Sequence, residues 1–470
     1  SLAWGVRMST TTETTPSAAA FGAGARPGDW TCPFCSLLCD RLAVEPGPVL
    51  RLRGAECPRA RTALAAFDGP ARAAPSVDGR SLGLNAALDA AAVRLAASRL
   101  ALFGGLATDV QGMRSLYRLA NVGGAILDHA HGEAMMPALR MLQDRGQMFA
   151  TIAEIRNRAD LIVCVGTDAV SSHPEFFRRC APADGRGDGG RVVFLAARDG
   201  APGAAEIPWA SAVDTLCRDG DIFEAVALLA ALVDGRRLDG AGARAGDSTG
   251  GPASAGSGAA GCDSDGSALA ALTGLAGAMR AARYCVIVWE PARLPPHGAL
   301  LGETLLRLLM NLNRKTRAGA FTLGGNDGAQ TANGAMSWLS GLPLRSRVGP
   351  QGVEHDPLQY ATGRLLDEHA VDLLLWVASF TPELAPPATA LPRIVLGHPG
   401  LAAGCAQAGT VFIPVATPGI NADGHLLRAD NVVSLPLHAV RDDGLLTVAE
   451  VARALVARLT TGATAKEGAQ

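Results

Sequence analysis

Four cysteines near the amino terminus have the spacing of a metal-binding motif. Cys32, Cys35 and Cys39 lie in the stretch WTCPFCSLLCD, and Cys57 follows in RGAECPRARTA. Four thiolates commonly hold an iron–sulfur cluster, and closely spaced cysteines let one loop wrap one face of it. Structural zinc also takes four cysteines, but usually as two C-x2-C pairs, and only one such pair is present here. The spacing favours a [4Fe-4S] cluster over zinc, and four cysteines without any metal is the third alternative.

A predicted β-hairpin would bring these four cysteines together. The stretches DRLAVEP and VLRLRGA alternate apolar and polar residues on either side of Pro46-Gly47-Pro48, which is a hairpin signal. Three of the cysteines precede the hairpin and the fourth directly follows it. We therefore expect a small cysteine-bearing unit over residues 29–70, in which the four side chains converge on one point.

Beyond residue 70, short apolar strands alternate with amphipathic helices. The stretch LNAALDAAAVRLAAS predicts a helix, ADLIVCVGTD and RVVFLAA predict buried strands, and GLLTVAEVARALVARL predicts a helix near the carboxyl end. Such alternation is typical of parallel sheets covered by helices on both faces. The predicted fold class is α/β, with doubly wound domains at 71–238 and 268–470 following the hairpin unit. An interleaved arrangement of the two regions is the alternative.

Two stretches are too poor in large apolar side chains to build a core. We expect residues 1–28 to be a disordered tail and residues 239–267 to be a flexible Gly/Ala/Ser segment. The first stretch also lacks the charged-then-apolar order of a secretory signal. No apolar run reaches the roughly 20 residues that a membrane helix needs. We therefore expect a cytoplasmic protein with no membrane partner.

Composition also argues against nucleic acid as a partner. The formal net charge is -2, and aromatic residues make up 4% of the chain. The sequence thus has neither the basic stripe nor the stacking side chains that such binding requires.

Polar residues in three stretches are candidates for a ligand cleft. His129 and His131 follow a predicted strand, and the carboxyl ends of parallel strands form ligand crevices. An H-x-H pair can bind metal, but a hydrogen-bonding role in a pocket is the favoured interpretation. The Gly- and Asn-rich stretches GGNDGAQTANGA and PGINADGHLLRADN suit tight turns and close backbone approach to a ligand. They would contribute Asn326, Asp327, Asn421 and Asp423 to the cleft, with His425 and Arg428 beside them, or would simply form connecting loops.

At these stretches the chain resembles a known family. CPFCSLLCD with its later cysteine, GGNDGAQTANGAMSWLSGLPL, and FIPVATPGINADGHLLRADNVVSLPL are similar to the B subunit of formylmethanofuran dehydrogenase. That protein is a molybdenum or tungsten pterin oxidoreductase. Among the relatives of that subunit, the chain also resembles the B subunit of the bacterial formyltransferase/hydrolase complex. The resemblance covers most of the chain and implies the pterin-oxidoreductase architecture.

Three departures from the family pattern argue against redox chemistry. Active members have a Cys or selenocysteine metal ligand in a Cys-His-Gly stretch, and the matching position here is Ala130 in LDHAHGEAMM. A lysine usually stands two residues beyond the fourth cysteine, where this chain has Arg59. The resemblance also implies that the C-terminal β-barrel that clamps the pterin is lacking. No tungsten or molybdenum pterin is therefore expected, and no catalytic residue is assigned to this chain.

The resemblance implies a structural subunit in a larger assembly. The complex would transfer a formyl group from a tetrahydropterin carrier to a methanofuran-like carrier and release formate during C1 oxidation. Its other members would be an amidohydrolase-like subunit, a formyltransferase subunit and a third structural subunit. One alternative is an active tungsten or molybdenum pterin dehydrogenase with a [4Fe-4S] cluster. Another is a module that holds the methanofuran-like carrier or its polyglutamate tail in the former pterin cleft, which Arg and Lys around the cleft would favour.

Overall fold

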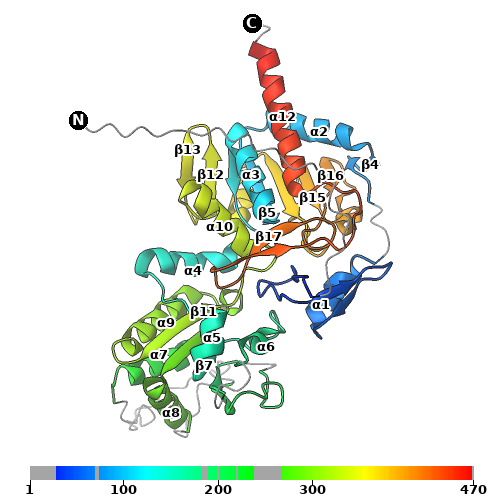
Figure 1. Ribbon diagram of the computed structural model, residues 1–470. Coiled ribbons are helices and arrows are strands. Elements are labelled where there is room, and N and C mark those ends of the chain that lie inside the picture. Colours follow the sequence, from blue (N-terminus) through cyan, green and yellow to red (C-terminus); the bar gives the residue numbers. More distant parts are fainter. Residues whose placement is uncertain are drawn as a thin grey trace, which may run out of the picture.

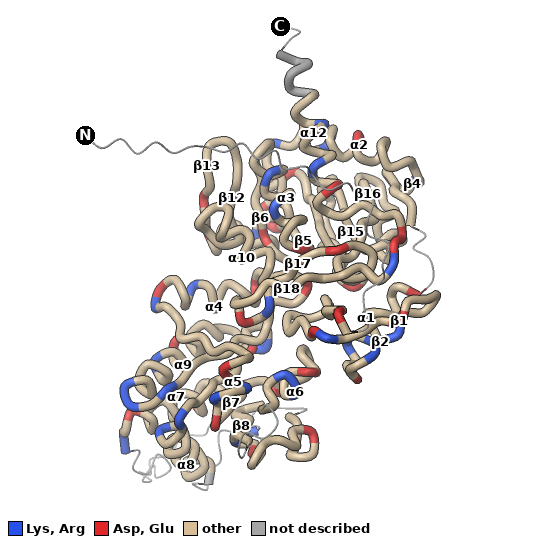
Figure 2. Tube along the Cα trace, in the orientation of Figure 1, with Lys and Arg blue, Asp and Glu red and all other residues tan. Residues whose placement is uncertain are grey.

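The computed structural model describes residues 28–68, 73–182, 189–197, 201–218, 221–237 and 267–467. The stretches expected to be disordered or flexible, 1–28 and 239–267, lie outside these ranges apart from Gly28 and Ser267. Two α/β bodies make up most of the described chain, with α4 (Gly132–Arg145) between them and the N-terminal unit alongside (Figure 1). Acidic and basic residues are scattered over both bodies (Figure 2).

The N-terminal unit is the predicted hairpin followed by a short helix. Strands β1 (Ala43–Glu45) and β2 (Arg51–Arg53) pair antiparallel, which confirms the hairpin. Helix α1 (Pro58–Ala65) begins directly after Cys57, with Pro58 at its first position, where the missing N–H of proline costs nothing. Trp30 is fully buried, and its indole donates to the carbonyl of Gly419 at 2.7 Å. The unit is thereby fixed to a segment almost 400 residues away in the chain.

The larger body is built on a nine-stranded sheet with the order β13-β12-β6-β5-β14-β15-β16-β3-β4. Its five central strands, β6 to β16 in that order, are parallel, and both edges are antiparallel hairpins. The strands are β3 (Ser76–Val77), β4 (Arg80–Ser81), β5 (Ala101–Ala107), β6 (Ala125–Leu127), β12 (Ser346–Gly349), β13 (Gly352–His355), β14 (Leu373–Ala378), β15 (Arg393–Gly397) and β16 (Thr410–Pro414).

Helices cover both faces of this sheet. Helix α12 (Val448–Glu467) packs on α2 (Leu84–Ala97) and α3 (Val110–Gly123), and α3 also packs on α10 (Ala329–Ser340). The short helix α11 (Thr362–Asp367) precedes β14, and the 3-10 turns η2 (Pro399–Leu401) and η3 (Ala403–Cys405) precede β16. Strands β5 and β14 are buried along their whole length, as expected for central strands of a parallel sheet. The α/β fold class is confirmed.

The smaller body is built on a five-stranded, fully parallel sheet with the order β11-β10-β7-β8-β9. Helix α7 (Ile222–Val233) packs on α8 (Ser267–Ala281) and α9 (Gly298–Leu312), and α5 (Ile152–Arg158) packs on α6 (Phe176–Cys180). The strands are β7 (Leu161–Val165), β8 (Arg191–Leu195), β9 (Ala212–Leu216), β10 (Tyr284–Trp289) and β11 (Arg317–Thr322), and the turn η1 (Pro291–Arg293) follows β10.

The two sheets take their strands from interleaved stretches of the chain. Strands β10 and β11 follow residues 239–267 but pair with β7, whereas β14 pairs with β5. The boundary expected at 239–267 therefore runs through the five-stranded sheet, and the interleaved alternative describes how both sheets are assembled. A two-stranded ribbon, β17 (Gly424–Leu427) with β18 (Ser434–Leu437), completes the elements. None of the helices in the described residues is long and apolar enough to span a bilayer.

One expected loop is partly helical. The Gly- and Asn-rich stretch 324–335 is irregular only through Gly328, and α10 begins at Ala329. Ala329, Ala332 and Ala335 recur at helical spacing and are fully buried, so they form the inner face of the helix. Because the stretch is rich in glycine and asparagine, its composition indicated a loop, and the helical spacing of the alanines was not recognised.

Candidate functional site

The segment from Asp128 to His131 leaves the carboxyl end of β6 and leads into α4. The N–H of Ala130 donates to the carbonyl of Gly105 at 3.1 Å, so the segment continues beside β5 after the strand has ended. Gly132 opens α4, and a Cβ there would lie 2.3 Å from a carboxylate oxygen of Asp128. Only glycine fits this close approach, which explains the glycine in HAHGE.

Ala130 does not face the cleft. Its methyl packs against the apolar cluster around Leu102 and Trp376, and only its neighbour His131 lines the adjacent cavity. The position that the resemblance assigns to the metal ligand thus carries no donor atom and is turned toward the core.

His129, His131 and Asp327 form one hydrogen-bonded group. The backbone N–H of His131 donates to Nδ1 of His129 at 3.0 Å, so the proton of the neutral His129 ring sits on Nε2. That nitrogen donates to the carbonyl of Asp327 at 3.2 Å. Nε2 of His131 lies 2.7 Å from Oδ2 of Asp327. The group joins the end of β6 to the loop before α10.

The environment sets the charge of this group. Burial lowers the pKa of His129 to about 3, and the neighbouring His131 contributes to this shift, so His129 is neutral. Burial acts to raise the pKa of Asp327, but the hydrogen bond from His131 and nearby positive charge outweigh it and leave that pKa below its usual value. Asp327 is therefore a buried carboxylate held by His131, which favours a structural, hydrogen-bonding role.

A cavity of about 690 Å³ opens beside His131. Its walls are mainly apolar and come from α4, α10 and the loop after β11. The polar groups that reach it include His131, Asn326, Gln330, Glu290 and Asp430. The apolar groups include Ala134, Met135, Ala138, Leu139, Leu142, Phe149, Leu323 and Trp338.

The lining does not fit a phosphate-bearing pterin. None of the described residues that line the cavity is Arg or Lys, the side chains that usually bind phosphate. The first amides of α10 are also engaged, because those of Ala329 and Gln330 donate to the carbonyls of Asn326 and Gly325. Glu290 adds a carboxylate instead, and Asp430 is paired with Arg428. The cavity suits an uncharged or cationic amphipathic group, and the polyglutamate-tail alternative gains no support from its lining.

The four candidate cysteines lie in one buried cluster. Cys32, Cys35, Cys39 and Cys57 are all less than 10% exposed and unpaired. The loop between the first three is closed by two backbone bonds, from the Cys32 amide to the Cys39 carbonyl and from the Leu38 amide to the Cys35 carbonyl. Burial raises the pKa of the Cys35 thiol to about 12 and that of Cys39 to about 11, and it raises that of Cys32 as well.

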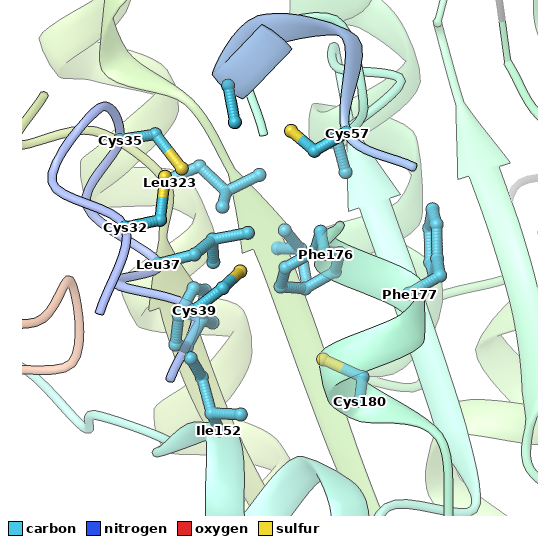
Figure 3. Packing of buried hydrophobic residues seen from close by; sticks show 14 of the residues in the cluster. Cys32, Cys35, Leu37, Cys39, Cys57, Ile152, Phe176, Phe177, Cys180 and Leu323 are labelled. Carbon is cyan, nitrogen blue, oxygen red and sulfur yellow. The ribbon is translucent and has the colours of Figure 1, made fainter. Parts of the chain in front are cut away.

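The thiols are the right donors for a cluster or zinc, but their arrangement does not fit one. Figure 3 shows the thiols of Cys32 and Cys35 pointing toward each other, with Leu37 drawn between this pair and Cys39 and with Cys57 on the far side of Leu323. Among the described His, Cys, Asp and Glu residues, no three are grouped closely enough to hold a metal ion. We therefore derive no chemistry from a metal at this point.

The cysteine loop is tied to the wall of the cavity. The N–H of Ser36 donates to Oδ1 of Asn326 at 3.0 Å, and the N–H of Ala429 donates to the Ser36 carbonyl at 2.8 Å. Nε of Arg59 donates to the Phe34 carbonyl at 2.7 Å. Arg59 thus holds the cysteine loop, where the family resemblance would put a relay lysine.

His173 is a site residue that sequence reasoning missed. It is fully buried, its Nε2 lies 3.1 Å from Oγ of Ser36, and its Nδ1 has no hydrogen-bond partner among the described residues. Burial and nearby Arg59 lower its pKa to about 4, so it is neutral. Its sequence context, SSHPEF, carries no periodic or motif signal that could have pointed to it.

Asn421 and Asp423 do not join the cavity lining. Oδ1 of Asn421 accepts from the amide of Thr417, and its Nδ2 donates to Asp443 at 2.8 Å. Asp423 accepts from the amide of Ala439 at 2.8 Å. Both side chains stabilise turns of the C-terminal segment. Arg428 of the same stretch pairs with Asp430, which does line the cavity.

Taken together, the fold and the site define a two-sheet α/β protein with a cysteine-bearing N-terminal unit and an apolar inter-body cavity. No family model matches the sequence. The chain is 29% identical over 351 residues to the B subunit of the formyltransferase/hydrolase complex Fhc of Methylorubrum extorquens, covering 74% of this chain and 87% of that protein. It is 22% identical over 450 residues to the B subunit of tungsten-containing formylmethanofuran dehydrogenase 2 of Methanocaldococcus jannaschii, covering 91% and 97%.

A solved structure supports the same relationship. The crystal structure of the FhcABCD formyltransferase/hydrolase complex of Methylorubrum extorquens with methylofuran contains a chain that is 29% identical, with a TM-score of 0.67. The match covers 83% of this chain and all of that chain. This protein is thus a homologue of the B subunit of the formyltransferase/hydrolase complex, and it is also related to the B subunit of formylmethanofuran dehydrogenase.

Proposed function

We propose that this chain is a non-redox structural subunit of a formyltransferase/hydrolase complex. The complex would transfer formyl from a tetrahydropterin carrier to a methanofuran-like carrier and release formate. The position of Ala130 carries the proposal, because the residue expected to ligate the metal has no donor atom and packs against the core. The similarity to the B subunit of a complex that was solved with methylofuran indicates the assembly.

The chemistry would then reside on partner subunits. An amidohydrolase-like subunit would hydrolyse the formyl amide, a formyltransferase subunit would move the formyl group, and a third structural subunit would complete the assembly. The cavity supports this division of labour. Its titratable groups are engaged in structural contacts, as the His131–Asp327 pair and the bond from Thr167 to Glu290 at 3.0 Å illustrate.

Co-expression with the three proposed partners tests assembly and chemistry together. Native mass spectrometry of the anaerobic preparation should find this chain in a hetero-oligomer that releases formate without an electron acceptor. Elemental analysis should find neither tungsten nor molybdenum. Formate oxidation that depends on either metal would overturn the proposal, and so would failure of the chain to assemble with these partners.

A triple variant resolves the state of the cysteines in the same experiment. Iron and acid-labile sulfide should be measured for the parent chain and for the Cys32→Ser/Cys35→Ser/Cys39→Ser variant. Iron and sulfide that disappear in the variant would establish a retained cluster, whereas zinc that disappears would establish a structural replacement. A preparation without either metal in both proteins would establish that the motif persists without its cluster.

A further inference from the structure

Among the described residues, two arginines are buried, and only one of them has a counter-ion. Arg345 is 3% exposed and forms ion pairs with Asp128 and Glu133. Arg393, the first residue of β15, is 8% exposed, and none of the described carboxylates forms an ion pair with it. A guanidinium keeps its charge in proteins, and a buried charge without a partner is costly. The surroundings of Arg393 therefore lack an anion.

Neutral groups hold the Arg393 side chain in place. Its Nε donates to Oγ1 of Thr410 at 2.9 Å, and its Nη2 donates to Oε1 of Gln407. Its backbone N–H donates to the carbonyl of Gly409 at 2.8 Å, and its carbonyl accepts from Arg94 at 3.1 Å. Nη1 has no hydrogen-bond partner in the described part of the chain. The guanidinium is thus fixed in position and keeps two N–H donors for a further acceptor.

The nearby groups that could supply negative charge do not supply it to Arg393. Burial raises the pKa of the Cys405 thiol above its usual value, and nearby Arg393 only reduces that rise, so the thiol is neutral. Asp78 is held elsewhere, because its Oδ1 accepts from Arg94 at 3.0 Å and from the amide of Gly409 at 2.7 Å. The missing anion therefore has to come from outside the described chain.

A pocket of about 270 Å³ adjoins Arg393. This volume is below the roughly 300 Å³ at which pockets for drug-sized ligands begin, so it suits a small molecule. Oγ1 of Thr389 accepts from the amide of Leu391 at 3.2 Å, which leaves its hydroxyl proton free to be donated into the pocket. The lining residues are mainly small and apolar apart from Arg393, Thr389 and Gln407, and they are Ala385, Pro386, Ala388, Thr389, Arg393, Leu401, Gly404, Cys405 and Gln407.

The walls of this pocket are held by hydrogen bonds within the chain. The indole of Trp376 donates to the carbonyl of Leu384 at 3.0 Å and so fixes the loop before β15. Nε2 of Gln407 donates to the carbonyl of Gly404 at 3.4 Å, which directs its Oε1 to Arg393. The site therefore exists before a ligand binds.

The pocket is separate from the cavity beside His131. Arg393 and Thr410 are the first residues of β15 and β16 and lie opposite each other at the amino ends of these strands. The segment that carries His131 leaves the carboxyl end of β6, which runs parallel to them in the same sheet. The two sites thus lie at opposite edges of the sheet, and none of the described residues lines both.

We propose that this pocket binds a small monocarboxylate, with the carboxylate on the Arg393 guanidinium and a short carbon chain against the apolar wall. A planar carboxylate matches the two-donor geometry of a guanidinium. One unpaired guanidinium balances one negative charge, and the apolar wall favours a ligand with hydrocarbon over an inorganic anion. The proposal goes beyond the scaffold function and does not depend on it.

Saturation-transfer NMR on the methyl group of propionate, titrated against the full chain at neutral pH and constant ionic strength, tests the proposal. Arg393→Gln should bind propionate about tenfold more weakly or worse, because a charge-assisted contact is lost. The control Arg114→Gln changes an exposed arginine of α3 and should bind like the parent chain. Absence of binding to the parent, or parental affinity in Arg393→Gln, would overturn the proposal.

Gln407→Glu provides a second, independent test. This substitution keeps the size of the side chain and places a carboxylate beside Arg393, so the guanidinium gains a counter-ion from the chain itself. The variant should unfold at a higher temperature than the parent in the absence of propionate, and it should no longer bind propionate. Undiminished propionate binding by the folded variant would overturn the proposal, whatever the stability of Arg393→Gln.

Competition tests the ligand class and the source of the carboxylate. Acetate should displace propionate, and inorganic phosphate of equal potency would overturn the carboxylate assignment. The same titration on the co-expressed hetero-oligomer should again detect propionate binding. Loss of binding on assembly would show that a carboxylate of a partner subunit occupies the pocket, and it would overturn the assignment to a free small molecule.

Discussion

At the scale of single residues, the site is held by one buried carboxylate. Asp327 has a positive φ of 53°, and it joins its own loop to His131 through its side chain and to His129 through its carbonyl. Asp and Asn are the non-glycine residues that adopt this backbone conformation most readily. Asp327→Asn therefore removes the charge while it preserves the backbone.

We predict that Asp327→Asn lowers the free energy of unfolding by about 1 kcal/mol at neutral pH, because a charge-assisted hydrogen bond becomes a neutral one. The pKa of Asp327 lies below its usual value of 3.8, so the carboxylate stabilises the fold above that value and loses its effect as the pH falls through the folded-state pKa. The difference between parent and variant in urea unfolding should therefore be the same at about pH 7 and pH 5. A difference that vanishes by pH 5 would contradict this assignment.

The sequence predicted part of this site. His129 and His131 could be placed at a strand end, and Asn326 and Asp327 could be placed in a loop, because both inferences use only local patterns. Asn421 and Asp423 could not be separated from them, because a turn-capping residue and a cleft residue look alike in sequence. His173 gave no signal at all, because its burial arises only when the cysteine loop packs against the loop after β7.

At the scale of elements, the cysteine loop is a packed apolar structure. Its thiols belong to the same buried cluster as Leu37, Phe176 and Leu323 (Figure 3). Thiolates are the reactive form of cysteine, and the raised pKa values of Cys35 and Cys39 leave almost none at neutral pH.

We predict that Cys32, Cys35 and Cys39 resist alkylation by iodoacetamide in the folded, metal-free chain near pH 8. They should react promptly once urea unfolds the chain, because unfolding removes the burial that raises their pKa values. Peptide mass spectrometry after brief labelling measures the reaction at each position, and elemental analysis verifies that metal is absent. Modification of these three thiols at equal rates with and without urea would contradict the packed loop.

Helix α10 begins and ends at glycines with nearly the same left-handed conformation. Gly328 precedes the helix with φ 75°, and Gly341 follows it with φ 79°. A Cβ on Gly328 would lie 2.5 Å from the carbonyl oxygen of Thr108, whereas a Cβ on Gly341 would meet nothing within 4 Å. Alanine at Gly341 would therefore cost only backbone strain, whereas alanine at Gly328 would cost the same strain and a steric clash as well.

We predict that Gly341→Ala destabilises the chain by about 1 kcal/mol, the strain of a left-handed alanine. Gly328→Ala should cost at least about 3 kcal/mol, because the backbone of Thr108 must also move. Chemical unfolding of both variants measures the difference. Equal destabilisation would show that the loop before α10 is not packed against Thr108.

Most elements followed from sequence periodicity, and α10 shows where that approach fails. The predicted helices α2 and α12 carry large apolar side chains at helical spacing and do not begin within a Gly- and Asn-rich stretch. Helix α10 buries small alanines and starts within a stretch of glycines and asparagines, so its local composition indicated a turn. Its helical state depends on packing against α3.

At the scale of the whole molecule, the two sheets take their strands from interleaved stretches of the chain. No single break in the chain would therefore divide one body from the other. The crossing points lie at α4 and at the loop from β11 to α10, which are the segments that build the cavity. Sequence patterns predict where strands lie but not which strands pair. The pairing of β10 with β7 could therefore not be predicted from the sequence. The cysteine loop adds contacts to both bodies through Asn326 and Gly419.

This arrangement buries three histidines in a neutral state. Burial lowers the pKa of His129 to about 3 and those of His173 and His398 to about 4. Nδ1 of His173 and Nε2 of His398 have no hydrogen-bond partner among the described residues, so a proton there would meet no acceptor. In the unfolded chain all three would titrate near the usual value of 6.5.

We predict that the chain loses stability steeply as the pH falls from about 6.5 to 5. Each histidine has a folded-state pKa below its unfolded value, so acid protonates the unfolded chain first, and each contributes a loss of roughly 1.4 kcal/mol per pH unit. Asp109 and Asp128 have raised pKa values and act in the opposite direction, because acid protonates these carboxylates in the folded chain first. Urea unfolding at several pH values measures the slope. His398→Gln should reduce it by about one third, because one of the three titrating groups is lost while the other two are untouched. A slope unchanged by this variant would mean that His398 is already protonated in the folded chain, and that the apolar setting around it does not exclude charge.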